Sequence, residues 1–334
     1  MGIAARGELS AHVLEGLAAP PGTLRPNPAV GVGDPLGDDD LQLALYLCYE
    51  LHYRGLPGVD EHWEWDPGLL GFRALLEASF EAALREAAPS VAPVAPDGVP
   101  AALRELAEQD AEPSLSRHLE RQATREQFEE FVAHRSAYQL KEADPHTFAL
   151  PRLTGGPKAA MVEIQADEYG GGNPARMHSA LFASTMSALG LDATYGAYVD
   201  RIPGVSLAIV NLMSLFALHR RLRGALVGQL ALFEMTSSLP NRRYANGLRR
   251  LGCDTPEATG FYDEHVEADA VHENIAAHDL AGGLARDEPE VADDIVFGAR
   301  ALDALDARAA AYVLSAWEQG KSSLLAPAAA ALPA

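Results

Sequence analysis

Apolar residues recur at three- and four-residue intervals along most of this chain, and the alternation typical of strands is nearly absent. This spacing is typical of amphipathic helices packed against one another. The sequence therefore predicts an all-α helical bundle with about seven core helices and further accessory helices at the N-terminus. The predicted helices of the core are 114–142, 156–169, 203–221, 222–237, 241–251, 256–278 and 287–319.

Turn-forming and capping residues divide the chain into four predicted parts. Acidic residues 38–40 and the pair Asp66-Pro67 predict the starts of two accessory helices, the first ending at Gly55 and the second near Ala87. A Pro-rich stretch, 90–101, predicts a loop or a boundary before the core. The parts are an irregular, partly mobile arm over 1–36, accessory helices over 37–112, the core over 113–322 and a mobile tail over 323–334.

Charge and composition narrow the classes of partner. The chain has 334 residues, enough for a large buried core, and 26 Lys+Arg against 47 Asp+Glu give a formal net charge of −21. So acidic a protein is a poor ligand for nucleic acid or an anionic membrane. Neither a secretory signal nor an apolar run of membrane-spanning length is present, and Cys48 and Cys253 fit free thiols. We expect a cytoplasmic protein with no nucleic-acid or membrane partner, and the sequence leaves a homodimer open.

Candidate chemistry is concentrated in residues 261–273, FYDEHVEADAVHE. His265, Asp269 and His272 are spaced i, i+4, i+7, which places two imidazoles and a carboxylate on one stripe of a helix. Such ligands suit a divalent transition metal, above all iron where open positions are needed for oxygen. The alternative is an acidic surface helix, because further carboxylates surround the three residues: Asp263, Glu264, Glu267 and Glu273.

Other predicted helices offer further ligands: Glu142, Glu168, His178 and Glu234. Glu234 is the most informative, since it stands amid leucines, a phenylalanine and a methionine, and a carboxylate is costly to bury unless it is paired or binds a metal. Its alternative role is a salt bridge to one of the nearby arginine-rich runs, RRLRG or NRRY.

Seven candidate ligands exceed what a mononuclear zinc site uses. Four carboxylates and three histidines match a carboxylate-rich dinuclear site inside a helical bundle. The ferritin-like signature requires Glu-x-x-His twice, and this spacing occurs at none of the seven positions. That fold is therefore the wrong template.

Taken together, these residues resemble the haem-oxygenase-like diiron oxidases and oxygenases, often labelled iron-containing redox enzymes. The resemblance covers roughly residues 115–320 and rests on the seven positions, including DEYG followed by His178 ten residues after Glu168. It implies a haem-oxygenase-like fold with two irons per chain. One iron would be held by Glu168, His178 and one histidine of the last triad. Glu142 and the other histidine would hold the second, and Glu234 and Asp269 would complete or bridge the pair.

The resemblance also implies the activity: a non-haem diiron oxidoreductase that uses O2 and an electron donor to oxidise a small-molecule substrate, an amino acid or amine derivative. Catalysis would rest on Glu142, Glu168, Glu234 and Asp269. Some amine N-oxygenases of the group carry an extra carboxylate seven residues after the DEYG glutamate, where this chain has Ala175. Desaturation, C–C cleavage and C–H hydroxylation therefore stay open beside N-oxygenation.

Two alternative functions remain on the same fold. A cofactor-free or thiaminase-like enzyme would need a nucleophilic cysteine, and a non-catalytic protein would act as a metal-binding or interaction module. Polar residues near the ligands, namely Arg135, Tyr138, Asp167 and Tyr169, are candidates to support the site, although packing or salt bridges are their simpler role. The remaining histidines and basic residues of interest are interpreted as structural or solvated: His134, His146, His219, His278, Arg220, Arg221 and Arg223.

Overall fold

The computed structural model describes residues 3–88, 92–109 and 114–327, and of residues 267–271 it describes the helical backbone without the side chains. Over these residues the chain forms helices and no strand. The predicted all-α class is therefore confirmed. The α-helices are α1 (Glu8–Leu17), α2 (Asp39–Glu50), α3 (Pro67–Ala87), α4 (Val99–Ala107), α5 (Leu115–Arg121), α6 (Arg125–Gln139), α7 (Asp144–Thr147), α8 (Gly155–Glu168), α9 (His178–Ala188), α10 (Gly204–Leu218), α11 (Arg223–Arg250), α12 (Pro256–Asn274), α13 (Gly282–Asp287) and α14 (Ala292–Glu318).

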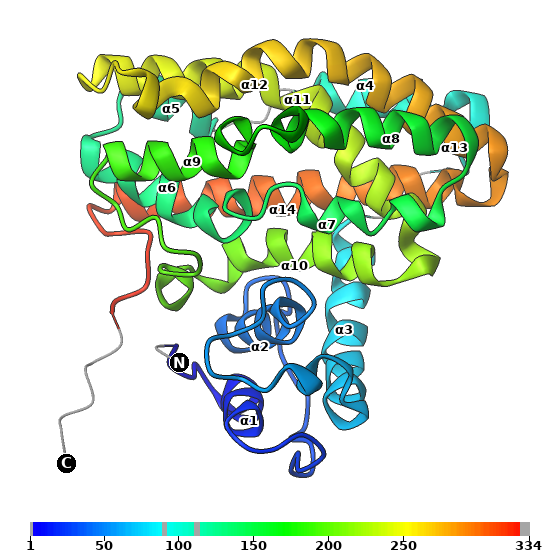
Figure 1. Ribbon diagram of the computed structural model, residues 1–334, viewed down its shortest axis with the longest axis vertical. Helices are drawn as coiled ribbons and strands as arrows, with labels where there is room; N and C mark the ends of the chain where they lie inside the picture. The colour runs from blue at the N-terminus through cyan, green and yellow to red at the C-terminus, as the bar shows by residue number, and fades with distance from the viewer. Residues whose placement is uncertain (1–2, 89–91, 110–113, 328–334) are drawn as a thin grey trace.

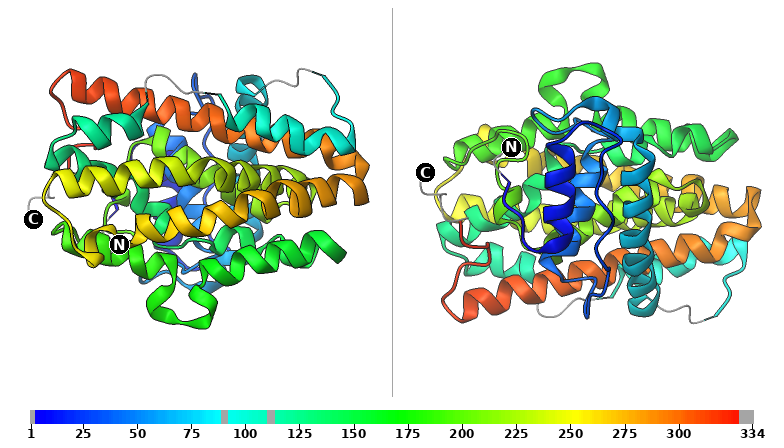
Figure 2. Two further views of the ribbon diagram at one scale, coloured as in Figure 1. Left: turned by 90° about the horizontal axis from the view of Figure 1, so that it is seen from above. Right: turned by 90° about the horizontal axis from the view of Figure 1, so that it is seen from below.

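Helix α11 is the central element of the bundle. It packs against α12, α14 and α5, and Figure 2 shows α11 and α12 lying between α14 on one side and α8 and α9 on the other. Helix α10 is buried along almost its whole length because it lies between the bundle and α2. The accessory helices α1, α2 and α3 occupy the side of the molecule beyond α10 (Figure 1).

Two glycines allow α11 and α14 to cross at very short distance. A Cβ atom at Gly228 would overlap the backbone carbonyl of Ile295, and a Cβ at Gly298 would overlap that of Ala225. The two backbones therefore touch, which only residues without a side chain permit. This crossing fixes the position of α11 relative to α14, and with it the position of Glu234 further along α11.

Side-chain caps set several of the predicted helix starts. Asp38 accepts a hydrogen bond from the backbone N–H of Leu41 at the start of α2, and Asp66 accepts one from Leu69 at the start of α3. Both starts were predicted from the sequence, and the predicted helix 156–169 matches α8 to within one residue at each end.

The predicted helix 114–142 is wrong as a single element. The chain breaks between α5 and α6, because Thr124 and Gln127 form a capping box that begins a new helix. Helix α6 then ends at Gln139, so Glu142 lies in the turn that follows.

Elsewhere the structure joins elements that were predicted to be separate, or adds helices where none was predicted. The predicted helices 222–237 and 241–251 are one helix, α11, which continues through Pro240 because α12 and α14 pack along it. The end of the predicted helix 256–278 is a π-helical segment, η8 (Ile275–Ala281), which packs on α8. The arm 1–36, expected to be irregular, contains α1, and α4 begins inside the Pro-rich stretch 90–101.

One hydrophobic core extends from Leu9 to Ala309 and includes residues of the accessory helices as well as of the bundle. Helix α4 packs directly on α11, α14 and η8. A second cluster, around Phe128, Tyr262 and Trp317, fills the end of the bundle beside α5 and α9. Among the described residues, no single helix has the length and apolar composition to cross a membrane, and only α10 and α11 counted together across a 109° bend pass that test.

Candidate metal centre

Five segments of the bundle bring six candidate ligands into its interior. The turn after α6 supplies Glu142, the last residue of α8 is Glu168, and the first residue of α9 is His178. Glu234 comes from α11, and His265 and His272 come from α12. All six side chains are buried. The two histidines of α12 therefore face the bundle interior, and the surface-helix alternative is wrong for them.

A glycine turn brings His178 back to Glu168. Gly170, Gly171 and Gly172 all have positive φ, the left-handed region in which other residues are strained. A side chain at Gly170 would meet the backbone of Arg176 at 2.6 Å, so the turn also needs the missing Cβ for space. As a result His178 Nδ1 lies 2.8 Å from Glu168 Oε2.

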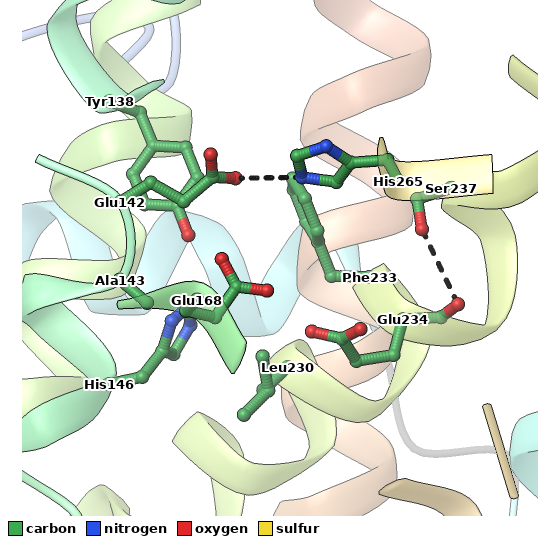
Figure 3. A pocket seen from close by; sticks show the side chains of 10 residues that line it. All are labelled: Tyr138, Glu142, Ala143, His146, Glu168, Leu230, Phe233, Glu234, Ser237 and His265. Atoms are coloured by element: carbon green, nitrogen blue, oxygen red, sulfur yellow. Dashed lines mark hydrogen bonds and ion pairs between the residues drawn. The ribbon is translucent and has the colours of Figure 1, made fainter. Parts of the chain in front are cut away.

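The first group of ligand atoms comes from Glu142, Glu168, His178 and His265. One donor atom from each lies within 4.8 Å of the others. His265 Nε2 is 3.7 Å from Glu142 Oε1 (Figure 3), and the rings of His178 and His265 are 4.3 Å apart between centroids. These separations suit four donors around one cation.

The second group comes from Glu168, Glu234 and His272, whose donor atoms also lie within 4.8 Å of one another. His272 Nδ1 is 3.3 Å from Glu234 Oε2. Glu168 belongs to both groups, so the two lie side by side. The grouping differs in two respects from the one implied by the resemblance: Glu142 lies in the same group as Glu168 and His178, and Glu168 is the carboxylate shared by both groups.

Hydrogen bonds orient both histidines of α12. His265 Nδ1 lies 2.7 Å from the carbonyl oxygen of Phe261, and His272 Nε2 lies 3.0 Å from Asp167 Oδ2. A carbonyl and a carboxylate only accept, so these nitrogens carry protons, and the opposite nitrogens face the ligand groups. This arrangement is typical of metal-binding histidines, and Asp167 has the supporting role considered from the sequence.

Several atoms of the two groups lack a hydrogen-bond partner within the described parts of the chain: Glu142 Oε2, Glu168 Oε2, His178 Nδ1 and His272 Nδ1. The close contact between His178 and Glu168 is within ion-pair distance but lacks hydrogen-bond geometry. Buried polar atoms without partners are costly, and their gathering in one place calls for an explanation. These atoms are explained if they are donors positioned to bind metal ions. The residues therefore fit the iron that the resemblance implies.

Electrostatics support the same interpretation. Burial by itself raises the pKa of Glu168, but His178, His265 and His272 outweigh it and lower that pKa to about 2. Burial opposes protonation of His272, yet Glu234 and Asp167 raise its pKa to about 9. In the absence of a metal, protons on the imidazoles thus balance the carboxylates, and a bound cation would displace them.

Asp269, the remaining predicted ligand, belongs to α12, but its side chain lies outside the described residues. Its role as a ligand stays a prediction.

His146 was interpreted as a structural or solvated histidine and not as part of the site, yet it lines a small pocket together with Glu142, Glu168, Glu234 and His265 (Figure 3). Its Nε2 pairs with Gln229 at 2.8 Å, and its Nδ1 has no hydrogen-bond partner among the described residues. The only indication in the sequence was its position four residues after Glu142. The Asp-Pro pair between the two residues predicts the end of a helix, so this spacing did not place them on one helix face.

The other histidines and arginines have the structural roles expected of them. His134 is buried between Ser206 and Ser323, and His219 contacts Glu77. Arg221 pairs with Glu81 and Arg223 with Glu288.

A second and much larger cavity, of about 730 Å³, adjoins the ligand groups. Tyr138, Phe233, Ser237 and His265 line both this cavity and the small pocket. Concave, mostly apolar pockets of this volume are typical of binding sites for small molecules. The geometry thus combines two adjacent groups of metal donors with a chamber that reaches one of their histidines.

Comparison with known proteins agrees with this geometry. A sequence model of the family described as iron-containing redox enzyme matches residues 129–307, which is more than half of the chain. The match includes all seven predicted ligands and confirms the resemblance seen in the sequence. No curated protein matches the chain.

Proposed function

This chain belongs to the iron-containing redox enzyme family, and we propose that it is a non-haem diiron oxidoreductase that uses O2 and an external electron donor to oxidise a small metabolite. The family accounts for iron and redox chemistry. The number of irons, the use of O2 and the kind of substrate are the proposal.

One observation carries the proposal of two irons: Glu168 belongs to two groups of donor atoms at once. A carboxylate has two oxygens and can bridge two cations, which is how carboxylate-rich bundle sites hold metal pairs. Glu142, His178 and His265 would complete one site, and Glu234 and His272 the other, with Asp269 available from α12.

Bound iron would supply the binding and reduction of O2. The chain's own residues have separate tasks. The carboxylates balance the charge of the metals, and the hydrogen bonds from His265 to Phe261 and from His272 to Asp167 hold the imidazoles in one tautomer. Phe233 and Tyr138 stand between the ligand groups and the large cavity, so they limit water at the place where a substrate would arrive.

The cysteine-dependent alternative has little support. Burial raises the pKa of Cys48 to about 12, so this thiol is a poor nucleophile. Cys253 contacts Arg125, and neither cysteine lines the two pockets beside the ligand groups.

An anaerobic Fe(II) titration tests the proposal. The purified chain is loaded, separated from free metal and assayed for iron. We expect about two irons per chain, followed by O2 consumption when a reductant is supplied. Binding of one iron or none would contradict a dinuclear centre. Iron binding without reductant-dependent O2 consumption would favour the non-catalytic metal-binding alternative.

A further inference from the structure

Glu142 differs from the other candidate ligands in how its position is set. Of the six ligand side chains that the structure describes, Glu142 alone comes from outside a helix, from the turn 140–143 between α6 and α7. The regular geometry of a helix fixes the direction of the ligands on α11 and α12, but not that of Glu142. The contacts that hold this turn therefore decide where the Glu142 carboxylate lies.

On one side the turn 140–143 contacts the accessory region. Lys141 Nζ lies 2.8 Å from Glu50 Oε2 at the end of α2, and both side chains are only 1% exposed. Tyr195 donates to the other carboxylate oxygen of Glu50. Arg54, shortly after α2, donates at 2.8 Å to the carbonyl oxygen of Leu140, at the end of α6 where carbonyl groups lack helical donors. Two bonds from the accessory region thus reach the two residues directly before Glu142.

On the other side the same turn contacts the end of α8. Gln165 donates to the carbonyl oxygen of Ala143 at 3.2 Å, and Tyr169 donates to the carboxylate of Asp144 at 2.9 Å. The turn is therefore held between α8 and the accessory region. From it the side chain of Glu142 points toward His265, as Figure 3 shows.

We propose that Glu50, Lys141 and Arg54 are positioning residues of the metal centre, through which the accessory region holds Glu142 in place for iron. The inference rests on the proposed function, because it takes Glu142 as an iron ligand. A ligand that is already held in its binding geometry loses less conformational freedom when the metal arrives. The bonds to the turn should therefore raise the iron affinity of the group that contains Glu142, besides stabilising the fold.

A second buried carboxylate of the accessory region provides a matched control. Glu77 of α3, with 6% of its side chain exposed, lies 3.2 Å from Arg73 Nε and 2.9 Å from His219 Nε2. Like Glu50 it has two partners, but these three residues lie outside the turn 140–143 and line neither pocket beside the ligand groups. Loss of Glu77 should cost stability alone, whereas loss of Glu50 should also affect the metal centre.

Iron affinity is measured on the full chain by anaerobic competition with a coloured Fe(II) chelator. A His272→Ala background confines the measurement to the first group, because His272 belongs to the second group alone. We expect Glu50→Gln to weaken iron binding roughly 2- to 30-fold, the usual range for residues that act on a site through intervening contacts. Glu77→Gln should leave the affinity unchanged, although both variants lose stability.

A double variant separates positioning from stability. Glu50→Gln combined with Lys141→Met leaves no unpaired buried charge, so most of the stability should return. The bond that holds the turn is still missing, so iron affinity should stay as low as in E50Q. Arg54→Gln removes the other bond to the turn at an exposed position, and it should weaken iron binding with little loss of stability.

Hydrogen exchange of the metal-free full chain gives a second measurement that needs no iron. Backbone amides of residues 139–147 should exchange faster in the double variant than in the wild type, and at the wild-type rate in E77Q. Equal exchange in the double variant and the wild type would overturn the inference, because the turn would then not depend on the accessory region.

The iron measurements can overturn it independently. Unchanged affinity in E50Q, recovery of affinity together with stability in the double variant, or an equal loss of affinity in E77Q would each show that the pair of Lys141 and Glu50 is purely structural. A normal iron content of the wild type beside any of these results would leave the proposed function intact. A wild-type chain that binds no iron would overturn the proposed function and this inference together.

Discussion

At the scale of single residues, the candidate centre depends on which atom of each side chain faces inward. Glu168 is shared by both ligand groups. His265 and His272 present opposite ring nitrogens, Nε2 and Nδ1, because their hydrogen bonds to Phe261 and Asp167 hold the other nitrogen. Loss of a single side chain should therefore have effects that differ between the two groups.

Glu168→Gln should reduce iron binding from about two per chain to nearly none, because an amide at the shared position weakens both sites together. His272→Ala should leave one iron, since it belongs to the second group alone. Iron assay after anaerobic loading measures both. Glu163→Gln, an exposed position of the same helix, is the control. Equal iron content in E168Q and H272A would contradict a bridging role.

Asp167→Asn should weaken iron binding at the second group roughly 10- to 100-fold, which is the usual effect of losing a carboxylate that orients a metal-bound histidine. The reason is that His272 Nε2 donates to Asp167 Oδ2 at 3.0 Å. Competition with a coloured Fe(II) chelator measures the affinity, again with E163Q beside it. Unchanged affinity would mean that the exposed Asp167 carboxylate does not orient His272.

At the scale of elements, the centre depends on contacts between segments far apart in sequence. Glu142 lies outside α6, in a turn whose neighbouring residue, Lys141, pairs with Glu50 of α2. The accessory helices thus contact the turn that carries a candidate ligand. Tyr195 also donates to Glu50, and Lys141 lies over the ring of Tyr53, so this contact is well packed.

Glu50→Gln should lower the free energy of unfolding by about 3–5 kcal/mol, since it leaves the buried ammonium group of Lys141 without its counter-charge. The double variant Glu50→Gln with Lys141→Met should recover most of the loss. Denaturant unfolding of the wild type, both single variants and the double variant gives the coupling. Additive losses in the double variant would show that the two charges do not stabilise each other.

At the scale of the whole molecule, one hydrophobic core joins the accessory helices to the bundle. The C-terminal segment takes part as well: Ser323, predicted to lie in a mobile tail, is buried and bonds to His134 and Glu130. His134 thereby links α6, Ser206 of α10 and the C-terminal segment. Stability of the molecule should therefore respond to the protonation of this histidine.

Burial lowers the pKa of His134 to about 4. Between pH 6.5 and 4 the unfolded chain then binds a proton at this position that the folded chain does not. Stability from this group is fully present above pH 6.5 and is lost as the pH falls, by a few kcal/mol in all at about 1.4 kcal/mol per pKa unit. His134→Gln should be less stable than wild type at pH 7, with the difference shrinking toward pH 4.

Urea unfolding of metal-free protein at several pH values checks this. The difference between wild type and H134Q cancels the other titrating groups, including those of the metal centre. His278→Gln, at an exposed position, should follow the wild type throughout. A difference between wild type and H134Q that stays constant from pH 7 to 4 would contradict the prediction.

The sequence alone determined the all-α class, the starts of α2 and α3, and a set of candidate ligands of which six have described side chains that meet in the interior. These features depend on local physics: helical spacing places His265 and His272 on one face, and capping residues begin helices wherever they occur. An isolated carboxylate in an apolar segment likewise identifies Glu234 without knowledge of its neighbours, because burying it alone is costly.

Only the tertiary structure decided how these residues are combined. The crossing at Gly228 and Gly298 and the glycine turn before His178 bring distant segments together. These contacts decide which glutamate is shared, and they place Glu142 with His265 and His146 beside them. The buried pair of Lys141 and Glu50 joins residues 91 positions apart. Local periodicity holds no information on such distances, because they are set by how the side chains of many helices pack in one core.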